Sequence, residues 1–125
     1  MRILPTRIHG FIDYAMGILL IASPYLFGFA TGFAEQYVPQ TLGAAAIVYS
    51  LFTRYELGMV RMLPMRAHLT LDIASGVLLM LSPWAFGFAN AAHWPHLILG
   101  FIALATALMT RTTPDGSYRL AHARR

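Results

Sequence analysis

The sequence predicts an all-α integral membrane protein, a four-helix bundle made of two tandem two-span repeats. Three observations support this prediction. Of the 125 residues, 58% are hydrophobic and only 11% are charged, whereas a soluble domain usually carries about 25% charged residues. The apolar residues gather in four long stretches, and the second half of the chain repeats the first. Helices are expected because irregular backbone cannot face lipid.

The composition excludes several other classes of protein. The chain has no cysteine, which excludes a disulfide scaffold, a zinc–thiolate module and a thiol nucleophile. A nucleic-acid partner is not expected, since the basic residues of such a binder form a solvated stripe beside an ordinary soluble core. The high hydrophobicity also argues against disorder.

Four apolar stretches approach the roughly 20 residues that a helix needs to cross a bilayer. They are residues 5–29, 39–53, 64–88 and 95–110. The second and fourth are short and are expected to recruit flanking residues such as Tyr37. A proline opens each stretch, which suits the first turn of a helix because no hydrogen bond is lost there. These are Pro5, Pro39, Pro64 and Pro95.

The nine arginines predict the orientation of the chain. They lie before the first span, between the second and third spans, and after the fourth, whereas the loops at 30–38 and 89–94 contain none. Positive residues stay on the cytoplasmic side, so both termini are expected inside, most simply at a bacterial inner membrane. A cleaved signal peptide is the rival interpretation of the first span, but the same segment recurs in mid-chain.

An internal duplication accounts for almost the whole chain. Residues 2–30 and 61–89 are identical at 16 of 29 aligned positions, and an offset of 57 then aligns the second spans. The chain is therefore expected to be one membrane domain, residues 1–125. It contains repeat one at about 2–54, repeat two at about 61–111 and a polar tail at 112–125, whose arginine-rich part is expected to anchor to lipid or, alternatively, to dock a cytoplasmic partner. Two spans in each repeat predict a pseudo-two-fold axis along the membrane normal.

Each copy closes its first span on a serine–proline–aromatic motif followed by Phe-Gly-Phe. The motifs are Ser23-Pro24-Tyr25 and Ser82-Pro83-Trp84. The proline withholds a hydrogen-bond donor, so each span is expected to kink or stop there, while the serine hydroxyl can reach a nearby carbonyl. The aromatic ring is expected at the outer interface, as a helix stop or, alternatively, as a periplasmic recognition surface.

The position of this motif, at the end of the first span of a two-span repeat, resembles the SPW-repeat family of small membrane proteins. The resemblance runs from Arg2 to Arg111. It implies a membrane-embedded helical fold and carries no established activity.

One histidine–aspartate pair lies inside the first span of each copy. His9 and Asp13 match His68 and Asp72, and the i, i+4 spacing places both groups of a pair on one helix face. The two aspartates are the only carboxylates within spans. They are expected to face the bundle interior, because a charge in hydrocarbon is costly.

Four interpretations of these pairs remain open. In the first, each aspartate bonds its own histidine, or Arg54 or Arg111, and so holds the helices together. In the second, the pairs handle protons or cations. In the third, His9 and His68 hold a haem as axial ligands, and in the fourth, the four residues bind a transition metal.

Small residues at matching positions predict close helix packing. They are Gly17, Gly43, Ala46, Gly76, Gly100 and Ala103. In the second outer loop, His93 and His96 have a spacing that permits metal binding, although loop histidines are usually solvated.

The sequence therefore predicts a non-catalytic structural or accessory subunit that packs against a larger membrane complex or against itself. The alternative is a small proton or cation transporter, or a haem- or metal-bearing redox module, that uses the paired histidines and aspartates. No nucleotide-binding or hydrolase motif is present, so an enzyme is not expected.

Overall fold

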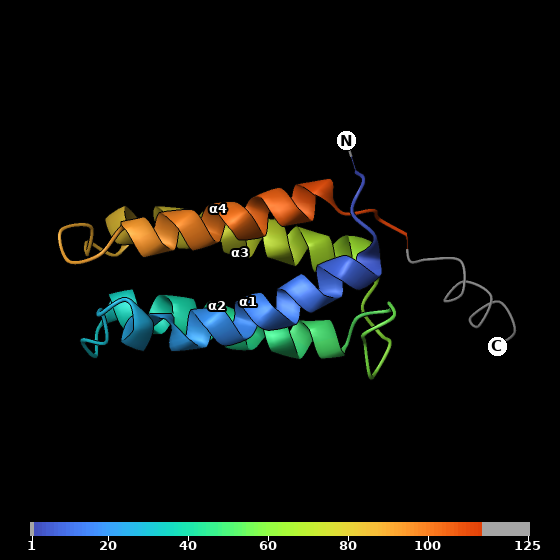
Figure 1. Ribbon diagram of the computed structural model, residues 1–125, viewed down its shortest axis with the longest axis horizontal. Coiled ribbons are helices and arrows are strands. Elements are labelled where there is room, and N and C mark those ends of the chain that lie inside the picture. The colour runs from blue at the N-terminus through green and yellow to red at the C-terminus, as the bar shows by residue number, and fades with distance from the viewer. Residues whose placement is uncertain (1, 114–125) are drawn as a thin grey trace, which may run out of the picture.

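The computed structural model describes residues 2–113, which form four helices. They are α1 (Thr6–Leu26), α2 (Ala34–Leu51), α3 (Met65–Ala85) and α4 (Trp94–Met109). Two antiparallel hairpins, α1–α2 and α3–α4, lie side by side (Figure 1). The predicted all-α four-helix bundle is thereby confirmed. The predicted tail lies mostly outside the described residues.

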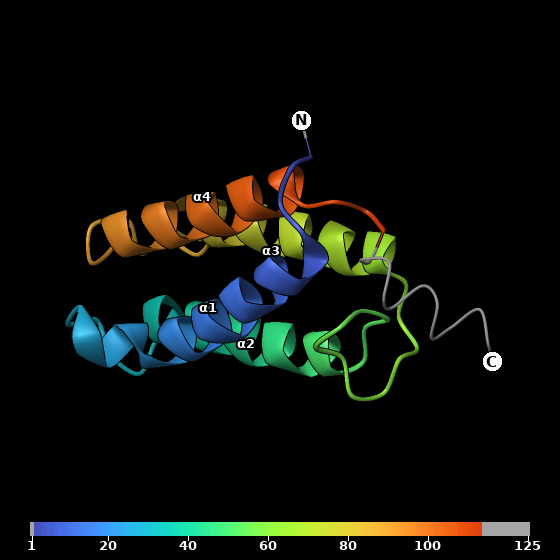
Figure 2. The ribbon, with the colours of Figure 1, turned by 45° about the vertical axis from the view of Figure 1, so that its right-hand side comes forward.

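The connecting segments lie in two groups, one at each end of the bundle. The N-terminal segment, the loop between α2 and α3, and the end of α4 lie at one end in both ribbon views. The loops between α1 and α2 and between α3 and α4 lie at the opposite end (Figures 1 and 2). The arginine-bearing segments of the described chain therefore share one end of the bundle, the arginine end.

The prolines define three of the four helix starts. Pro5 and Pro64 precede α1 and α3 in extended conformation, and Pro95 lies in the first turn of α4. The predicted start at Pro39 is wrong, because α2 begins five residues earlier, at Ala34. Pro39 is tolerated inside the helix because the carbonyl that it leaves free, that of Glu35, accepts a bond from His96 Nε2 at 2.9 Å.

The two serine–proline motifs lie inside helices, close to their ends. α1 and α3 continue for two residues beyond Pro24 and Pro83 before they end. Proline leaves the carbonyl four residues earlier without its donor. The serine hydroxyls supply that donor instead: Ser23 Oγ donates to Leu20 O at 2.8 Å and Ser82 Oγ to Leu79 O at 2.7 Å.

Glycines bring the two helices of each hairpin into backbone contact. A Cβ atom on Gly43 would lie 2.6 Å from the carbonyl oxygen of Gly17, and one on Gly100 would lie 2.8 Å from that of Gly76. Neither distance is tolerated by a real side chain, so only glycine permits these approaches. Ala46 on α2 is buried and Ala103 on α4 is partly buried, as small residues at a helix interface are.

Between the hairpins, an apolar cluster and polar groups share the interior. Leu20, Leu79 and Leu99 form the apolar cluster. Toward the arginine end, buried polar side chains such as His9 and His68 lie beside a second apolar cluster of Tyr55, Met65, Leu69 and Ala107. Among residues 2–113, no helix meets the combined length and hydropathy expected of a membrane-crossing segment.

Candidate functional site

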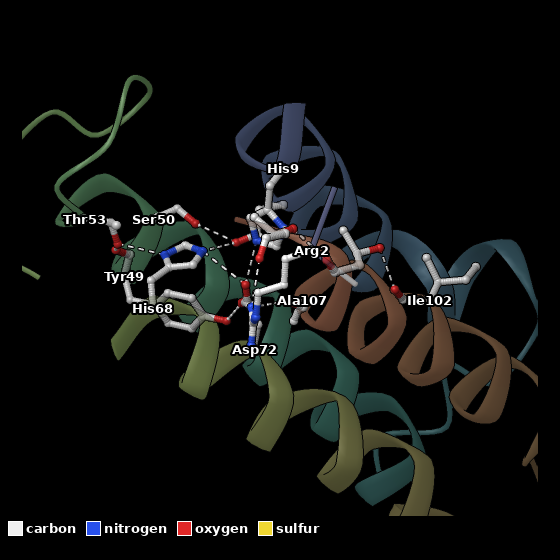
Figure 3. A network of polar contacts seen from close by, with 12 residues as sticks. Arg2, His9, Tyr49, Ser50, Thr53, His68, Asp72, Ile102 and Ala107 are labelled. Carbon is white, nitrogen blue, oxygen red and sulfur yellow. Dashed lines mark hydrogen bonds and ion pairs between the residues drawn. The ribbon is translucent and has the colours of Figure 1, made fainter. Parts of the chain in front are cut away.

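The two predicted histidine–aspartate pairs meet in the bundle interior. His9 and Asp13 come from α1 and His68 and Asp72 from α3, and all four side chains are buried. Figure 3 shows His9, His68 and Asp72 close together at the junction of the hairpins. We call these four residues the tetrad.

The shortest contacts in the tetrad cross between the repeats. His9 Nε2 lies 2.8 Å from Asp72 Oδ2, and His68 Nε2 lies 2.6 Å from Asp13 Oδ2. The contacts within one helix are longer, 3.4 Å for His9–Asp13 and 3.1 Å for His68–Asp72. Each aspartate therefore contacts its own histidine, as expected, but lies closer to the histidine of the other repeat. Side chains one turn apart point in parallel into the interface, where they face the opposite helix.

Neither arginine proposed as a partner takes part in the tetrad. Arg54 and Arg111 are exposed, and each donates its backbone N–H to the segment that opens the other repeat, at Leu63 O and Leu4 O. The end of each repeat therefore pairs with the beginning of the other. The guanidinium of Arg2 adds to this closure by donating to Thr110 O at 2.8 Å.

Two threonines orient the imidazoles. Thr53 Oγ1 lies 2.8 Å from His68 Nδ1, and Thr110 Oγ1 lies 2.8 Å from His9 Nδ1. Each hydroxyl also donates its single hydrogen to the carbonyl four residues earlier, at 2.6 Å. The oxygen can then only accept, so each Nδ1 carries a hydrogen and each Nε2 faces the carboxylates.

Two further donors contact the carboxylates, both from α2. Tyr49 Oη makes a short hydrogen bond to Asp72 Oδ1, and Ser50 Oγ donates to Asp13 Oδ2 at 3.2 Å. The matching positions of α4 are Thr106 and Ala107. The repeat pattern does not indicate a site role for Tyr49 or Ser50, because neither residue recurs in the second copy. Thr53 and Thr110, in contrast, are the same residue at matching positions, and this recurrence could have indicated their role.

The loop between α2 and α3 covers the tetrad at the arginine end. Thr6 Oγ1 donates to the Glu56 carboxylate at 2.8 Å and Tyr14 Oη donates to Leu57 O at 2.9 Å, which fastens this loop to α1. Tyr55 is fully buried beneath it, with its ring 5.5 Å from that of His68, and burial raises the pKa of its hydroxyl. The tetrad is therefore shielded from solvent on this side.

A small cavity lies beside the tetrad toward the middle of the bundle. Its volume is about 20 Å³, enough for one water molecule, and Asp13, Asp72 and Tyr49 contribute to its wall. Leu20 and Leu79 line its other side and belong to the apolar cluster between the hairpins.

Comparison with known families gives a match that covers most of the chain. A family model described as the SPW repeat domain matches residues 7–110. The chain belongs to the SPW repeat family. Neither a curated protein nor a solved structure matches it.

The motif that gives the SPW family its name divides into a buried and an exposed part. The serines and prolines are buried in both copies, whereas the rings of Tyr25 and Trp84 are exposed. In this SPW repeat chain the first two residues therefore complete the helix interior. The aromatic residue faces outward, at the end of the bundle opposite the arginines.

The histidines expected in an outer loop do not lie together as a pair. His96 lies in α4 and is buried, with its ring 4.8 Å from that of Phe29 and 4.9 Å from that of Phe88. The expectation that His96 is solvated is wrong, because its Nε2 donates a hydrogen bond to the Glu35 carbonyl that Pro39 leaves free. His93 instead bonds Ala89 O through Nδ1 at 3.0 Å.

Proposed function

We propose that this SPW repeat protein is a small multi-pass membrane protein with a structural or accessory role. It would pack against a larger membrane complex or against a second copy of itself. Family membership suggests a small membrane protein. The finer proposal rests on how polarity is distributed over the bundle.

The observation that carries the proposal is an apolar exterior around a polar interior. Every helix exposes large apolar side chains, while ionisable groups of α1 and α3 are buried. Examples are Phe11 and Ile18 of α1, Val48 of α2, Leu81 of α3 and Phe101 of α4. Soluble monomers rarely expose apolar surface so widely, whereas a lipid environment favours it.

The same distribution supports an orientation and a symmetry. The arginine end would face the cytoplasm, with both chain termini on that side. The exposed rings of Tyr25 and Trp84 would lie at the other interface, where amphipathic aromatic residues are enriched. Matching crossed contacts of His9 with Asp72 and of His68 with Asp13 support a pseudo-two-fold axis along the membrane normal.

A structural role fits the interior better than transport does. The polar groups of the tetrad bond one another, and the apolar cluster of Leu20, Leu79 and Leu99 lies between the hairpins. A haem would have to separate imidazoles that lie in edge contact, with ring centroids 5.5 Å apart. We therefore assign the tetrad the role of a clasp between the two repeats.

Single-cysteine labelling tests the membrane topology cleanly, because the chain has no cysteine of its own. Met59→Cys marks the arginine end and Asn90→Cys the opposite end, both at exposed loop positions. In intact cells, a membrane-impermeant maleimide is expected to label the Asn90→Cys variant and to reach the Met59→Cys variant only after lysis. Labelling of Met59→Cys in intact cells would overturn the orientation. Release of the chain from membranes by alkaline carbonate would overturn the embedding.

A second experiment tests the accessory role. Gentle detergent extraction followed by size analysis is expected to give a stable homo-oligomer or a complex with other membrane subunits. A bare monomer that never associates would contradict this role. An ion or proton flux abolished by Asp13→Asn with Asp72→Asn, in a folded protein, would favour the transporter instead.

A further inference from the structure

We infer that the tetrad binds one divalent transition-metal ion of the Zn²⁺ type, through His9 Nε2, His68 Nε2 and one oxygen each of Asp13 and Asp72. This inference extends the clasp assigned to the tetrad, because the ion would join α1 to α3. It does not depend on where the chain resides.

The positions of the four donors carry the inference. One ligand atom from each residue lies within 4.8 Å of all the others, and all four residues are buried. Three of the four nitrogen–oxygen contacts, at 2.6, 2.8 and 3.1 Å, involve Oδ2 of Asp13 or of Asp72, and the fourth, at 3.4 Å, involves Asp13 Oδ1. In a tetrahedral site with bonds of ~2.0 Å, neighbouring donors lie ~3.3 Å apart. Binding therefore needs the short contacts to open by less than about 1 Å and the wider donor separations, which extend to at most 4.8 Å, to close.

The imidazoles are already oriented as a metal ion needs. The hydrogen on each Nδ1 points to Thr53 or Thr110, so each Nε2 is directed inward, and its lone pair becomes available to the ion once the proton shared with the carboxylate is displaced. Metal-binding histidines commonly hold their second nitrogen in this way, which fixes both tautomer and ring orientation. Tyr49 and Ser50 similarly hold the carboxylates. The chain thus supplies both the four ligands and the side chains that orient them.

A divalent metal ion can replace two protons in the tetrad without changing the charge of the site. Without metal, each of the two short contacts, His9–Asp72 and His68–Asp13, requires one shared proton. A divalent ion that displaces those two protons leaves the net charge of the buried site unchanged. The interior therefore gains no uncompensated charge on binding, which matters because such charge is costly there.

The donor set selects the kind of ion. Two imidazole nitrogens and two carboxylate oxygens in a compact four-coordinate set suit Zn²⁺ and related first-row ions. Mg²⁺ and Ca²⁺ prefer six or more oxygen ligands. The cavity of about 20 Å³ beside Asp13 and Asp72 leaves room for one water as an additional ligand.

The test uses the full chain, purified without a polyhistidine tag in mild detergent and stripped with a chelator. After dialysis against Zn²⁺, elemental analysis is expected to give one ion per chain, and Zn²⁺ is expected to raise the thermal midpoint. Co²⁺ is expected to give the visible absorption of a tetrahedral nitrogen–oxygen site. Wild-type protein that is helical, yet binds no Zn²⁺ and gives no Co²⁺ spectrum, would overturn the inference.

Variants locate the ion. His9→Gln and His68→Gln are expected to abolish the Co²⁺ spectrum, whereas the matched control His93→Gln is expected to bind like wild type. Thr53→Val, which removes only the group that orients His68, is expected to weaken binding by about 10- to 100-fold. Its control is Thr70→Val, where the hydroxyl bonds only within α3. A folded His9→Gln protein with an unchanged Co²⁺ spectrum would overturn the assignment. Loss of Zn²⁺ binding would leave the cysteine-labelling pattern unaffected, so the two proposals fail separately.

Discussion

The hairpins α1–α2 and α3–α4 match closely in the histidines of the tetrad and in the threonines that orient them, and they differ in the donors that α2 and α4 add. Thr53 and Thr110 hold the imidazole of the opposite repeat with equal distances of 2.8 Å. The donors to the carboxylates, Tyr49 and Ser50, both come from α2. At the matching positions Thr106 bonds its own helix, and Ala107 has no side-chain donor. One hairpin therefore completes the polar site of both.

The opposite end of the bundle shows a second asymmetry, in the reverse direction. Here α4 supplies His96, whose Nε2 donates a hydrogen bond to the Glu35 carbonyl in α2. The position of repeat one that matches His96 is Pro39, the residue that frees this carbonyl. Each repeat thus carries a part that the other lacks. The two repeats therefore complete one another through these contacts.

The largest expected effect tests the matched part of the comparison. His9→Ala and His68→Ala each leave buried carboxylates without their main partner, which costs about 3–5 kcal/mol of unfolding free energy. The two losses are expected to be similar, because the contacts are equivalent. Denaturant titration in mild detergent, followed by circular dichroism, measures them. The control His93→Ala is expected to change little, and a loss below about 1 kcal/mol for either tetrad variant would contradict the clasp.

The next effect tests the asymmetry between α2 and α4. Tyr49→Phe removes a donor from a buried carboxylate and is expected to cost about 1.5–3 kcal/mol. Thr106→Val, its counterpart in the other repeat, removes a hydroxyl that bonds only its own helix, and is expected to cost within about 0.5 kcal/mol. The same denaturant titration compares them. A loss for Tyr49→Phe as small as that expected for Thr106→Val would contradict the role of Tyr49 as a donor to the buried carboxylate.

The glycine contacts offer a finer comparison of the two hairpins. An added methyl group at Gly43 meets the backbone of Gly17 and Leu20 Cβ, whereas at Gly100 it first meets the side chain of Met80. Gly43→Ala and Gly100→Ala are each expected to destabilise by about 1–3 kcal/mol, with the greater loss at Gly43. Thermal unfolding in detergent gives the order. Ala45→Val, on the exposed face of α2, is the control, and a Gly43→Ala protein as stable as this control would contradict the close backbone packing.

The smallest expected effect concerns the serine–proline motifs. Ser23→Ala and Ser82→Ala each remove the hydroxyl that satisfies a carbonyl freed by proline, at a cost of about 0.5–1.5 kcal/mol. Because the two geometries agree, equal losses are expected. A Ser23→Ala, Pro24→Ala double variant is expected to recover stability, since the backbone N–H returns. Failure to recover would mean that the serine does not act through this carbonyl.

The repeat pattern in the sequence predicts the four helices, and it predicts that the histidines and aspartates lie in the interior. It does not predict the crossed pairing, since i, i+4 spacing defines a helix face and leaves the partner open. Glu35 and Gln36 resemble loop residues, and Pro39 resembles a first-turn proline, so the start of α2 is misplaced. The role of His96 depends on a carbonyl in another helix, which no local pattern in the sequence reveals.

Double-mutant cycles on the tetrad test the crossed clasp most directly. Unfolding free energies in metal-free detergent solution would be compared for the His9–Asp72 pair, which joins the repeats, and the His9–Asp13 pair, which lies within α1. The crossed pair, at 2.8 Å rather than 3.4 Å, is expected to show the larger coupling energy, by about 1 kcal/mol. An equal or larger coupling within α1 would contradict the conclusion that the tetrad holds the two repeats together.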